Sequence, residues 1–238
     1  MKIVVVGSGG REHAIALQLA RSPRVSEVIS APGNPGMSRL GACWPAISKS
    51  NFTEFVQRCS EESIAHVVIG PEAPLVDGLA DLLRAAGIPC FGPNSKGAML
   101  EGSKAFAKDF MQRHEIPTAL SSTVVNVDQL PAALSTLPER VVVKASGLAA
   151  GKGVILCEDH QQATEVATGM LNGALFGDSG KTVVIEEMME GPEVSILAVV
   201  NGEDALLLPP AQDHKPLGDG NTGPNTGGMG AFCPGTFT

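Results

Sequence analysis

The sequence predicts an α/β protein, with a doubly wound parallel sheet in its N-terminal part and a smaller α+β arrangement behind it. Short apolar runs alternate with helical patterns over residues 1–100, and a denser series of strand patterns follows. Glycine-rich turns stand directly after several of the apolar runs. Alternating strands and helices are typical of a parallel sheet covered by helices. We therefore expect one domain at residues 1–100 and a second, strand-rich domain at residues 101–238.

The N-terminal elements are expected in a regular order. A helix is expected to begin near Asn51, because this N-cap residue type precedes Glu54 by three positions. The segment Gly92-Pro93-Asn94 marks the approach to the domain boundary. The expected strands cover residues 2–6, 25–30, 66–69 and 89–91, and the other expected helices cover residues 11–21, 78–86 and 103–113.

The second domain is expected to contain more strands than helices. One helical pattern covers residues 161–171. The expected strands cover residues 141–144, 154–157, 182–186 and 194–200.

Composition excludes some classes of protein. The formal net charge is −8 and no basic run occurs, which argues against nucleic-acid binding. The apolar run at residues 3–6 is too short for a signal sequence or a membrane span, so we expect a cytoplasmic protein that binds no membrane. Five cysteines without a C-x-x-C pair suggest neither a zinc site nor a disulfide framework, and we expect them to be reduced and buried.

The first turn, residues 7–13, has the sequence Gly-Ser-Gly-Gly-Arg-Glu-His. It stands between a strand and a helix, where backbone N–H groups and the helix dipole favour an anion. Glu12 occupies the position of the third glycine in the dinucleotide fingerprint, which disfavours a nicotinamide-dependent oxidoreductase. A tight turn that binds nothing is the alternative.

The segment at residues 70–75 follows the expected strand at residues 66–69. It therefore falls at a carboxyl end of the sheet, where open α/β folds bind ligands. Glu72 could contact a ribose or an amine. A proline-flanked acid that only begins a helix is an equally good interpretation.

A glycine-rich loop separates the two expected strands at residues 141–144 and 154–157. It departs from a P-loop, because Ser146 and Gly153 replace required residues and a strand follows in place of a helix. A mobile hairpin of this kind can close over a triphosphate, with Lys144 and Lys152 neutralising charge. An ordinary hairpin with two solvated lysines is the alternative.

Two further segments carry polar residues of interest. Residues 186–193 combine acids with methionines, which could accept hydrogen bonds from adenine and ribose and pack on the base. An acidic hairpin turn is the alternative there. Residues 213–230 contain Asp213, His214 and Lys215 followed by a glycine-, asparagine- and threonine-rich stretch, which we interpret as a loop that holds anions. A flexible surface linker is the alternative for that stretch.

Taken in this order, the motifs resemble those of the ATP-grasp ligases, and specifically the phosphoribosylamine–glycine ligase family. The resemblance runs from end to end and includes the segment at residues 100–104. It implies a pre-ATP-grasp N-terminal domain and a partial ATP-grasp domain, with a small lid subdomain at about residues 122–188.

The resemblance also implies which residues bind ligands. It identifies residues 147–153 as the lid loop, residues 186–189 as the adenine hinge and Glu193 as the ribose contact. The implied ATP-binding residues are Lys104, Lys144, Gly147, Gly151, Lys152, Gly153, Glu186, Glu187, Met188, Met189 and Glu193. The implied substrate-binding residues are Gly9, Gly10, Glu72, Asp213, Lys215, Asn225, Thr226, Gly227 and Gly228.

The activity implied by the resemblance is the ATP-dependent joining of glycine to 5-phosphoribosylamine through a glycyl phosphate, in purine biosynthesis. Mg²⁺ or Mn²⁺ would bridge the ATP phosphates, and the metal ligands of the family are expected beyond Thr238. The chain alone is therefore expected to be inactive or weak. A non-catalytic ATP-binding fragment and another ATP-grasp carboxylate–amine ligase are the alternatives. Pro216 and Asn221 stand where the family commonly has arginine and aspartate.

Overall fold

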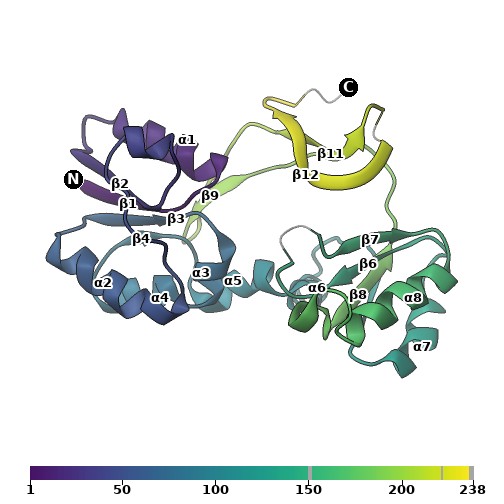
Figure 1. Cartoon of the computed structure of the whole chain (residues 1–238). Coiled ribbons are helices and arrows are strands. Elements are labelled where there is room, and N and C mark those ends of the chain that lie inside the picture. Colours follow the sequence, from purple (N-terminus) through teal and green to yellow (C-terminus); the bar gives the residue numbers. More distant parts are fainter. Residues whose placement is uncertain (150–151, 221, 236–238) are drawn as a thin grey trace. The chain divides into compact units, whose positions relative to one another are not determined.

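A computed structural model of the chain describes residues 1–149, 152–220 and 222–235. The chain forms two compact units, Met1–Ile116 and Pro117–Thr238. The first contains a parallel sheet with helices on both faces, and the second contains antiparallel sheets and fewer helices (Figure 1). The predicted fold class is therefore confirmed.

The sheet of the first unit has the strand order β2-β1-β3-β4, and all of its neighbouring strands run parallel. Since β2 lies on one side of β1 and β3 on the other, the strand order reverses at β1. The strands are β1 (Lys2–Gly7), β2 (Glu27–Pro32), β3 (His66–Ile69) and β4 (Cys90–Phe91).

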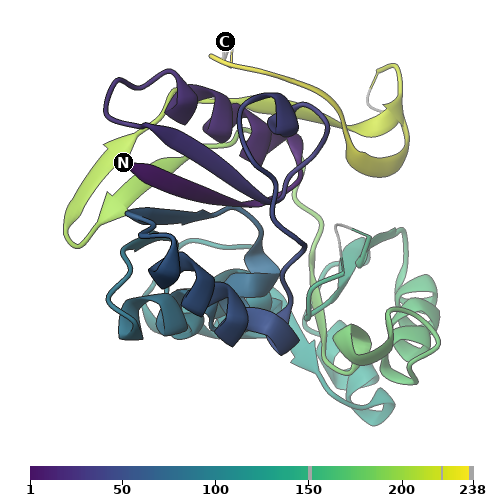
Figure 2. The same ribbon diagram turned by 60° about the vertical axis from the view of Figure 1, so that its left-hand side comes forward.

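Alternate residues of β1 enter two hydrophobic cores, one on each face of the sheet. Val4 and Val6 pack with the residues of α2 and α4, and Ile3 and Val5 pack with those of α1. Figure 2 shows helices above and below this sheet. The helices of this unit are α1 (Gly10–Ala20), η1 (Met37–Arg39), η2 (Lys49–Asn51), α2 (Phe52–Glu61), α3 (Glu72–Val76), α4 (Leu79–Ala85), α5 (Ser95–Gly102) and α6 (Lys104–Arg113).

The helices of the first unit differ from the sequence prediction in several details. Asn51 is the N-cap residue of α2, but its side chain accepts a hydrogen bond from the backbone of Ser48 (2.8 Å) and does not cap the helix. Helix α5 was not expected, because its eight residues include two glycines and bury only Ala98.

The second unit contains a four-stranded antiparallel sheet with the order β5-β8-β6-β7. Two helices, α7 and α8, cover one face of this sheet. The hydrophobic core between the sheet and these helices includes Val141 and Val143 of β6 with Ala163 and Ala167 of α8. The elements are β5 (Ser121–Val124), η3 (Val127–Gln129), α7 (Leu130–Leu134), β6 (Val141–Ala145), β7 (Val154–Cys157), α8 (His160–Leu171), η4 (Gly177–Gly180) and β8 (Val183–Glu187).

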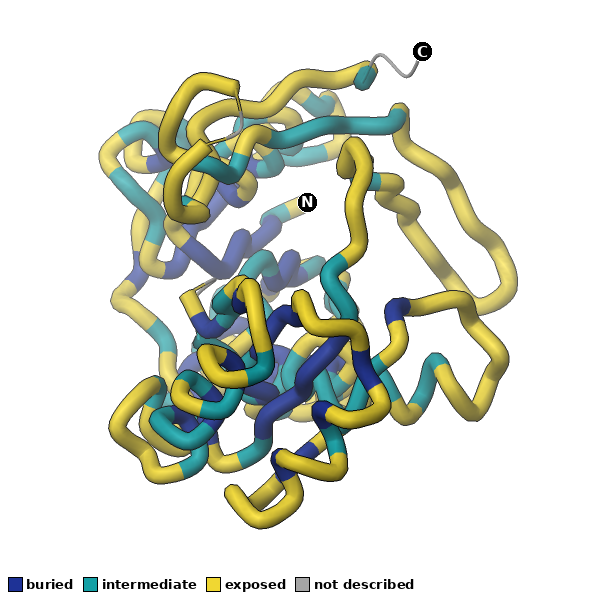
Figure 3. The backbone as a smooth tube through the Cα atoms, turned by 90° about the vertical axis from the view of Figure 1, so that its right-hand side faces the viewer, coloured by how far each residue is buried: buried dark blue, intermediate teal, exposed yellow. Residues whose placement is uncertain are grey.

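Two antiparallel strand pairs follow in the same unit, β9 (Ala198–Asn201) with β10 (Asp204–Leu207) and β11 (Gln212–Gly218) with β12 (Thr222–Phe232). The prediction of a loop over residues 220–230 was wrong, because residues 222–230 lie in β12 and pair with β11. Their pairing is irregular, with register shifts on either side of Pro216. In Figure 3 the tube that leads to the C terminus is mostly coloured as exposed.

The hairpin β9–β10 is apolar on both of its faces. Val199 pairs with Leu206 and Ala198 with Leu207, and consecutive strand residues point to opposite faces. Leu206 and Leu207 are 66% and 69% exposed. An antiparallel hairpin with one solvated face normally alternates apolar and polar residues, so this hairpin lacks the usual polar side.

The cysteines were only partly predicted. All five are free thiols; Cys59 and Cys157 are buried, whereas Cys43 and Cys233 are exposed. Burial raises the pKa of the Cys59 thiol to about 12 and that of the Cys157 thiol to about 11. These two thiols therefore stay protonated and unreactive near neutral pH.

We predict that Leu206→Lys and Leu207→Lys, made separately, change the free energy of unfolding of this chain by less than about 0.5 kcal/mol, as exposed positions do. The added charge should also disfavour any self-association through this exposed apolar hairpin. Urea unfolding and sedimentation velocity measure the two effects. Leu83→Lys is the control, because Leu83 is fully buried; this variant should lose at least about 4 kcal/mol. A comparable loss in either hairpin variant would contradict the prediction.

Candidate functional site

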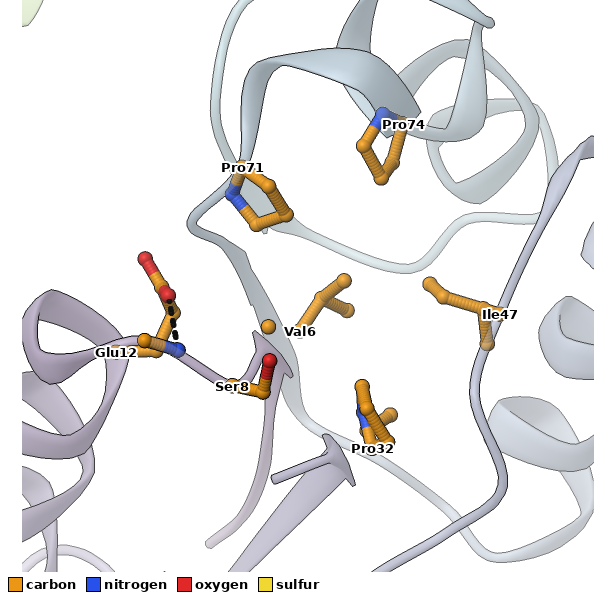
Figure 4. Close-up of a pocket in the computed structure, with 10 residues that line it drawn as sticks. Val6, Ser8, Glu12, Pro32, Ile47, Pro71 and Pro74 are labelled. Carbon is orange, nitrogen blue, oxygen red and sulfur yellow. Dashed lines mark hydrogen bonds between the residues drawn. The ribbon is translucent and has the colours of Figure 1, made fainter. Parts of the chain in front are cut away.

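A pocket of about 210 Å³ lies in the first unit, where the carboxyl ends of β1, β2 and β3 meet (Figure 4). The strand order reverses here between β1 and its two neighbours, which is where doubly wound sheets bind ligands. Residues from four separate segments form its wall. The lining residues are Val6, Gly7, Ser8, Gly9, Glu12, Ala31, Pro32, Ile47, Pro71 and Pro74.

Of the three residues predicted for substrate binding in this unit, Gly9 lines the pocket. Gly10 and Glu72 begin α1 and α3 and lie next to lining residues, without being among them. The backbone N–H of Gly9 donates to Oε2 of Glu12 (2.9 Å), as the dashed line in Figure 4 marks. The anion that contacts this turn is therefore a carboxylate of the protein itself.

Sequence reasoning missed other parts of this wall. Pro32 ends β2, and Ile47 lies in a segment without a recognisable motif. Only the strand order brings them to the first turn, so no local pattern could have identified them.

Lys104, the first predicted ATP contact, begins α6 in the first unit. Its neighbour Ser103 caps the helix by accepting a hydrogen bond from the backbone of Phe106 (3.2 Å). Burial lowers the pKa of the Lys104 ammonium, and the nearby charge of Glu101 opposes this shift. The remaining predicted ATP contacts lie in the second unit.

Lys144 and Glu186 form an ion pair in the four-stranded sheet of the second unit. Val142 pairs directly with Glu186 across β6 and β8, so Lys144, two residues further on, lies diagonally opposite on the same face. Their side chains are 28% and 5% exposed. Two residues that were predicted separately are thus joined in one largely buried pair.

The glycine-rich loop joins β6 to β7, as predicted. At its start the backbone N–H of Gly147 donates to the carbonyl of Ser179 (3.1 Å), and the Ser179 hydroxyl donates to the carbonyl of Leu148 (2.6 Å). At its end, the carbonyl of Gly153 accepts from Ala145 (2.8 Å) and the N–H of Lys152 donates to Ala149 (2.9 Å). Gly151 lies outside the described residues. Both described ends of the loop are therefore fixed.

The predicted adenine hinge, residues 186–189, begins with the last two residues of β8. The Glu187 carboxylate accepts a hydrogen bond from the backbone N–H of Leu120 (2.8 Å), and the N–H of Met188 donates to Arg140 (3.3 Å). Met189 is 73% exposed. The backbone of the hinge is thus held, while one methionine projects into solvent.

Lys215 connects residues that were predicted for different ligands. Its ammonium pairs with Glu193, the predicted ribose contact, and lies 3.8 Å from the carboxylate of Asp213. The hydrogen bond to Glu193 raises the pKa of Lys215. Its carbonyl accepts from the hydroxyl of Thr226 (2.8 Å), which in turn accepts from the N–H of Gly228 (3.0 Å).

Asn225 and Gly227 lie in β12, and Asn225 pairs with Pro216 of β11. Asn221 lies outside the described residues. The predicted substrate contacts in this unit therefore share one strand pair, β11–β12.

The described residues contain neither a cluster of metal ligands nor a membrane-spanning helix. Within residues 1–149, 152–220 and 222–235, no group of three or more His, Cys, Asp or Glu could hold a metal ion. No helix in the same part of the chain is long and apolar enough to cross a membrane.

Comparison with known proteins assigns the whole chain to one family. Residues 1–101 match the N domain of phosphoribosylglycinamide synthetase, and residues 102–238 match its ATP-grasp (A) domain. The chain belongs to the phosphoribosylglycinamide synthetase family.

Relatives in this family are similar over almost the whole chain. A phosphoribosylamine–glycine ligase of Xanthomonas axonopodis pv. citri is 51% identical over 98% of the chain, which covers 54% of that protein. The human trifunctional purine biosynthetic protein adenosine-3 is 47% identical, and the match covers 23% of its length. The chain thus spans about half the length of the single-function relative.

Solved structures agree with this assignment. A phosphoribosylamine–glycine ligase of Thermotoga maritima matches the complete chain with a TM-score of 0.84 and 34% identity, and 56% of that structure is covered. An ADP complex of N5-carboxyaminoimidazole ribonucleotide synthetase has a TM-score of 0.75 at 17% identity, covers 100% of this chain and is itself 58% covered. The second likeness concerns the fold alone.

We predict that Lys144→Met destabilises the chain by about 3–5 kcal/mol, because it leaves the buried Glu186 carboxylate without the lysine's charge. The double variant Lys144→Met/Glu186→Leu should recover most of this loss, because it removes both charges. Urea unfolding measures both. Lys181→Met is the control, since it breaks an exposed pair with Asp178 (2.7 Å) and should change little. A small loss in Lys144→Met would count against a buried pair.

We also predict that Lys104 titrates below 10.5, the usual pKa of a lysine. Nuclear magnetic resonance of reductively ¹³C-methylated lysines measures this pKa. Glu101→Gln should lower it further, because the carboxylate favours the charged ammonium. Lys181 is the internal control, because its pKa is raised by the hydrogen bond to Asp178. If Lys104 titrated above Lys181, the prediction would be wrong.

Proposed function

We propose that this chain is part of an ATP-dependent ligase that joins glycine to 5-phosphoribosylamine, giving glycinamide ribonucleotide, ADP and phosphate in purine biosynthesis. The observation that carries the proposal is the 51% identity, over 98% of the chain, to a protein named phosphoribosylamine–glycine ligase. The activity is proposed for a protein of that relative's length. A cytoplasmic location belongs to the same proposal.

In this proposal the pocket of the first unit binds phosphoribosylamine. Gly9, Gly10 and Glu72 would contact it, and the position at the carboxyl ends of β1 and β3 supports this assignment. Apolar lining residues such as Val6 and Ile47 would exclude water from one side of the sugar.

ATP would be held by lysines and by the hinge. Lys104, Lys144 and Lys152 would neutralise phosphate charge, while residues 186–189 and Glu193 would bind adenine and ribose. Lys144 is already oriented by its pairing with Glu186. Phosphoryl transfer to a carboxylate depends mainly on positioning and charge neutralisation, so no covalent protein nucleophile is required.

The ribbon β11–β12 would hold glycine and the transferred phosphoryl group. Asp213 would accept from the ammonium of glycine, and Lys215 would attract its carboxylate. Residues 225–228 would add backbone and side-chain donors. The resulting glycyl phosphate reacts with water, so the loop at residues 147–153 would protect it until the amine of phosphoribosylamine attacks.

Mg²⁺ or Mn²⁺, when bound, would supply positive charge that offsets the charge of the ATP phosphates. The described residues contain no carboxylate cluster that fits such an ion. The residues named above are proposed to supply binding and orientation only.

A second candidate function is ATP binding without turnover. It is favoured by the fact that the chain spans only about half of the single-function relative's length. A ligase that acts on another carboxylate and amine is a third reading, supported only by likeness in fold.

We predict that a ligase of the relative's length with this chain as its N-terminal part releases ADP only when both glycine and phosphoribosylamine are present. The chain of 238 residues should bind an ATP analogue but release little or no ADP, because it covers only 54% of the length for which the activity is proposed. A coupled ADP assay and calorimetry measure the two properties.

The outcomes separate the candidates. ADP release without dependence on glycine and phosphoribosylamine in the longer protein would overturn the proposed reaction. Robust release by the 238-residue chain, dependent on both substrates, would instead show that this chain is sufficient for the reaction.

A further inference from the structure

A buried carboxylate lies between the two turns that border the pocket of the first unit. Glu12 is only 4% exposed, although it lies in the first turn of a surface helix. Three glycines surround it: a Cβ added to Gly9 would lie 2.8 Å from its Oε2, and one added to Gly7 or Gly70 would also collide with this side chain. The space for the carboxylate therefore exists only because these three positions have no side chain.

Arg11 joins this carboxylate to the second turn. Its Nε donates to Oε1 of Glu12 (2.7 Å), and its Nη2 donates to the carbonyl of Gly70 (2.6 Å). Gly70 directly precedes the turn that begins α3. One guanidinium thus holds the β1–α1 turn and the β3–α3 turn together across 59 residues of sequence.

These two turns carry the residues assigned above to phosphoribosylamine. Gly9 and Gly10 follow β1, and Glu72 follows β3. Arg11 lies outside the pocket lining and Glu12 forms part of it, and their hydrogen bonds to each other, to Gly9 and to Gly70 set the spacing between the turns. The Glu12 carboxylate also accepts from the N–H of Gly9, which fixes the conformation of the first turn.

We propose that Arg11 and Glu12 are positioning residues that set the distance between the two turns and thereby the affinity for phosphoribosylamine. This inference rests on the proposed function, because it requires the pocket to bind that substrate. Charge-assisted hydrogen bonds within a glycine-lined space suit this role, since they are short and directional. A glutamine at position 12 keeps the shape and loses the charge, and a methionine at position 11 loses both donors.

The test measures binding of ribose 5-phosphate, a stable probe that shares the phosphoribosyl group, to the 238-residue chain by calorimetry. Glu12→Gln and Arg11→Met should weaken this binding about tenfold or more, while binding of a non-hydrolysable ATP analogue should not change. Arg11→Lys, which keeps the charge but can make only one of the two contacts well, should fall between. Arg21→Met, at the other end of α1, is the matched control and should bind like the wild type.

Thermal unfolding of each variant distinguishes positioning from stability. A purely structural role would lower the unfolding midpoint and leave the affinity of the folded protein unchanged, which would overturn the proposal. The Arg11 side chain is 63% exposed, so Arg11→Met is expected to fold even if Glu12→Gln does not. If the wild type failed to bind ribose 5-phosphate, the assignment of this pocket in the proposed function would fall, and the positioning role with it. Wild-type binding with unchanged variants would overturn the positioning role alone.

Discussion

In both candidate binding regions of this protein, neighbouring segments approach the backbone so closely that there is no room for a side chain at certain glycines. In the first unit, Gly7, Gly9 and Gly70 leave the space that Glu12 fills. In the second, a Cβ on Gly147 would lie 2.9 Å from the Cα of Ser179, and one on Gly153 would lie 2.7 Å from the Cβ of Ala149. Glycine at these positions therefore determines how neighbouring segments meet, and only secondarily how freely the chain bends.

Paired charges complement this close packing. Arg11 with Glu12, Lys144 with Glu186 and Lys215 with Glu193 each join a basic residue to an acid that is close in space. The partners in the last two pairs come from different strands or segments, so each pair also fixes the relation between them. In the proposed function, a lysine held in this way would bind an anionic ligand with less loss of side-chain entropy than a solvated one.

Much of the fold follows from local patterns. The strands β1, β3, β6 and β7 were predicted within a residue of their bounds, because apolar runs that meet glycine or proline leave few alternatives. The strand β12 was predicted as a loop, since its glycines favour turns and only pairing with β11 holds it extended. The end of the sheet where the pocket lies was predictable, but the contact between Gly147 and Ser179 was not, because no local signal relates residues so far apart in sequence.

The apolar composition of both faces of the hairpin β9–β10 affects how its strands are kept in register. If the pairing of the two strands shifted by one residue, Leu206 and Leu207 would exchange faces. Because both faces are apolar, the hydrophobic pattern would not oppose this shift. Registration of the two strands must instead come from the connection between them. Gly202, with φ of 62°, is the first of the two residues that join Asn201 to Asp204, and a glycine-first, two-residue connection is a preferred hairpin geometry. The conformation of a single glycine in the turn thus determines the register of this pair of strands.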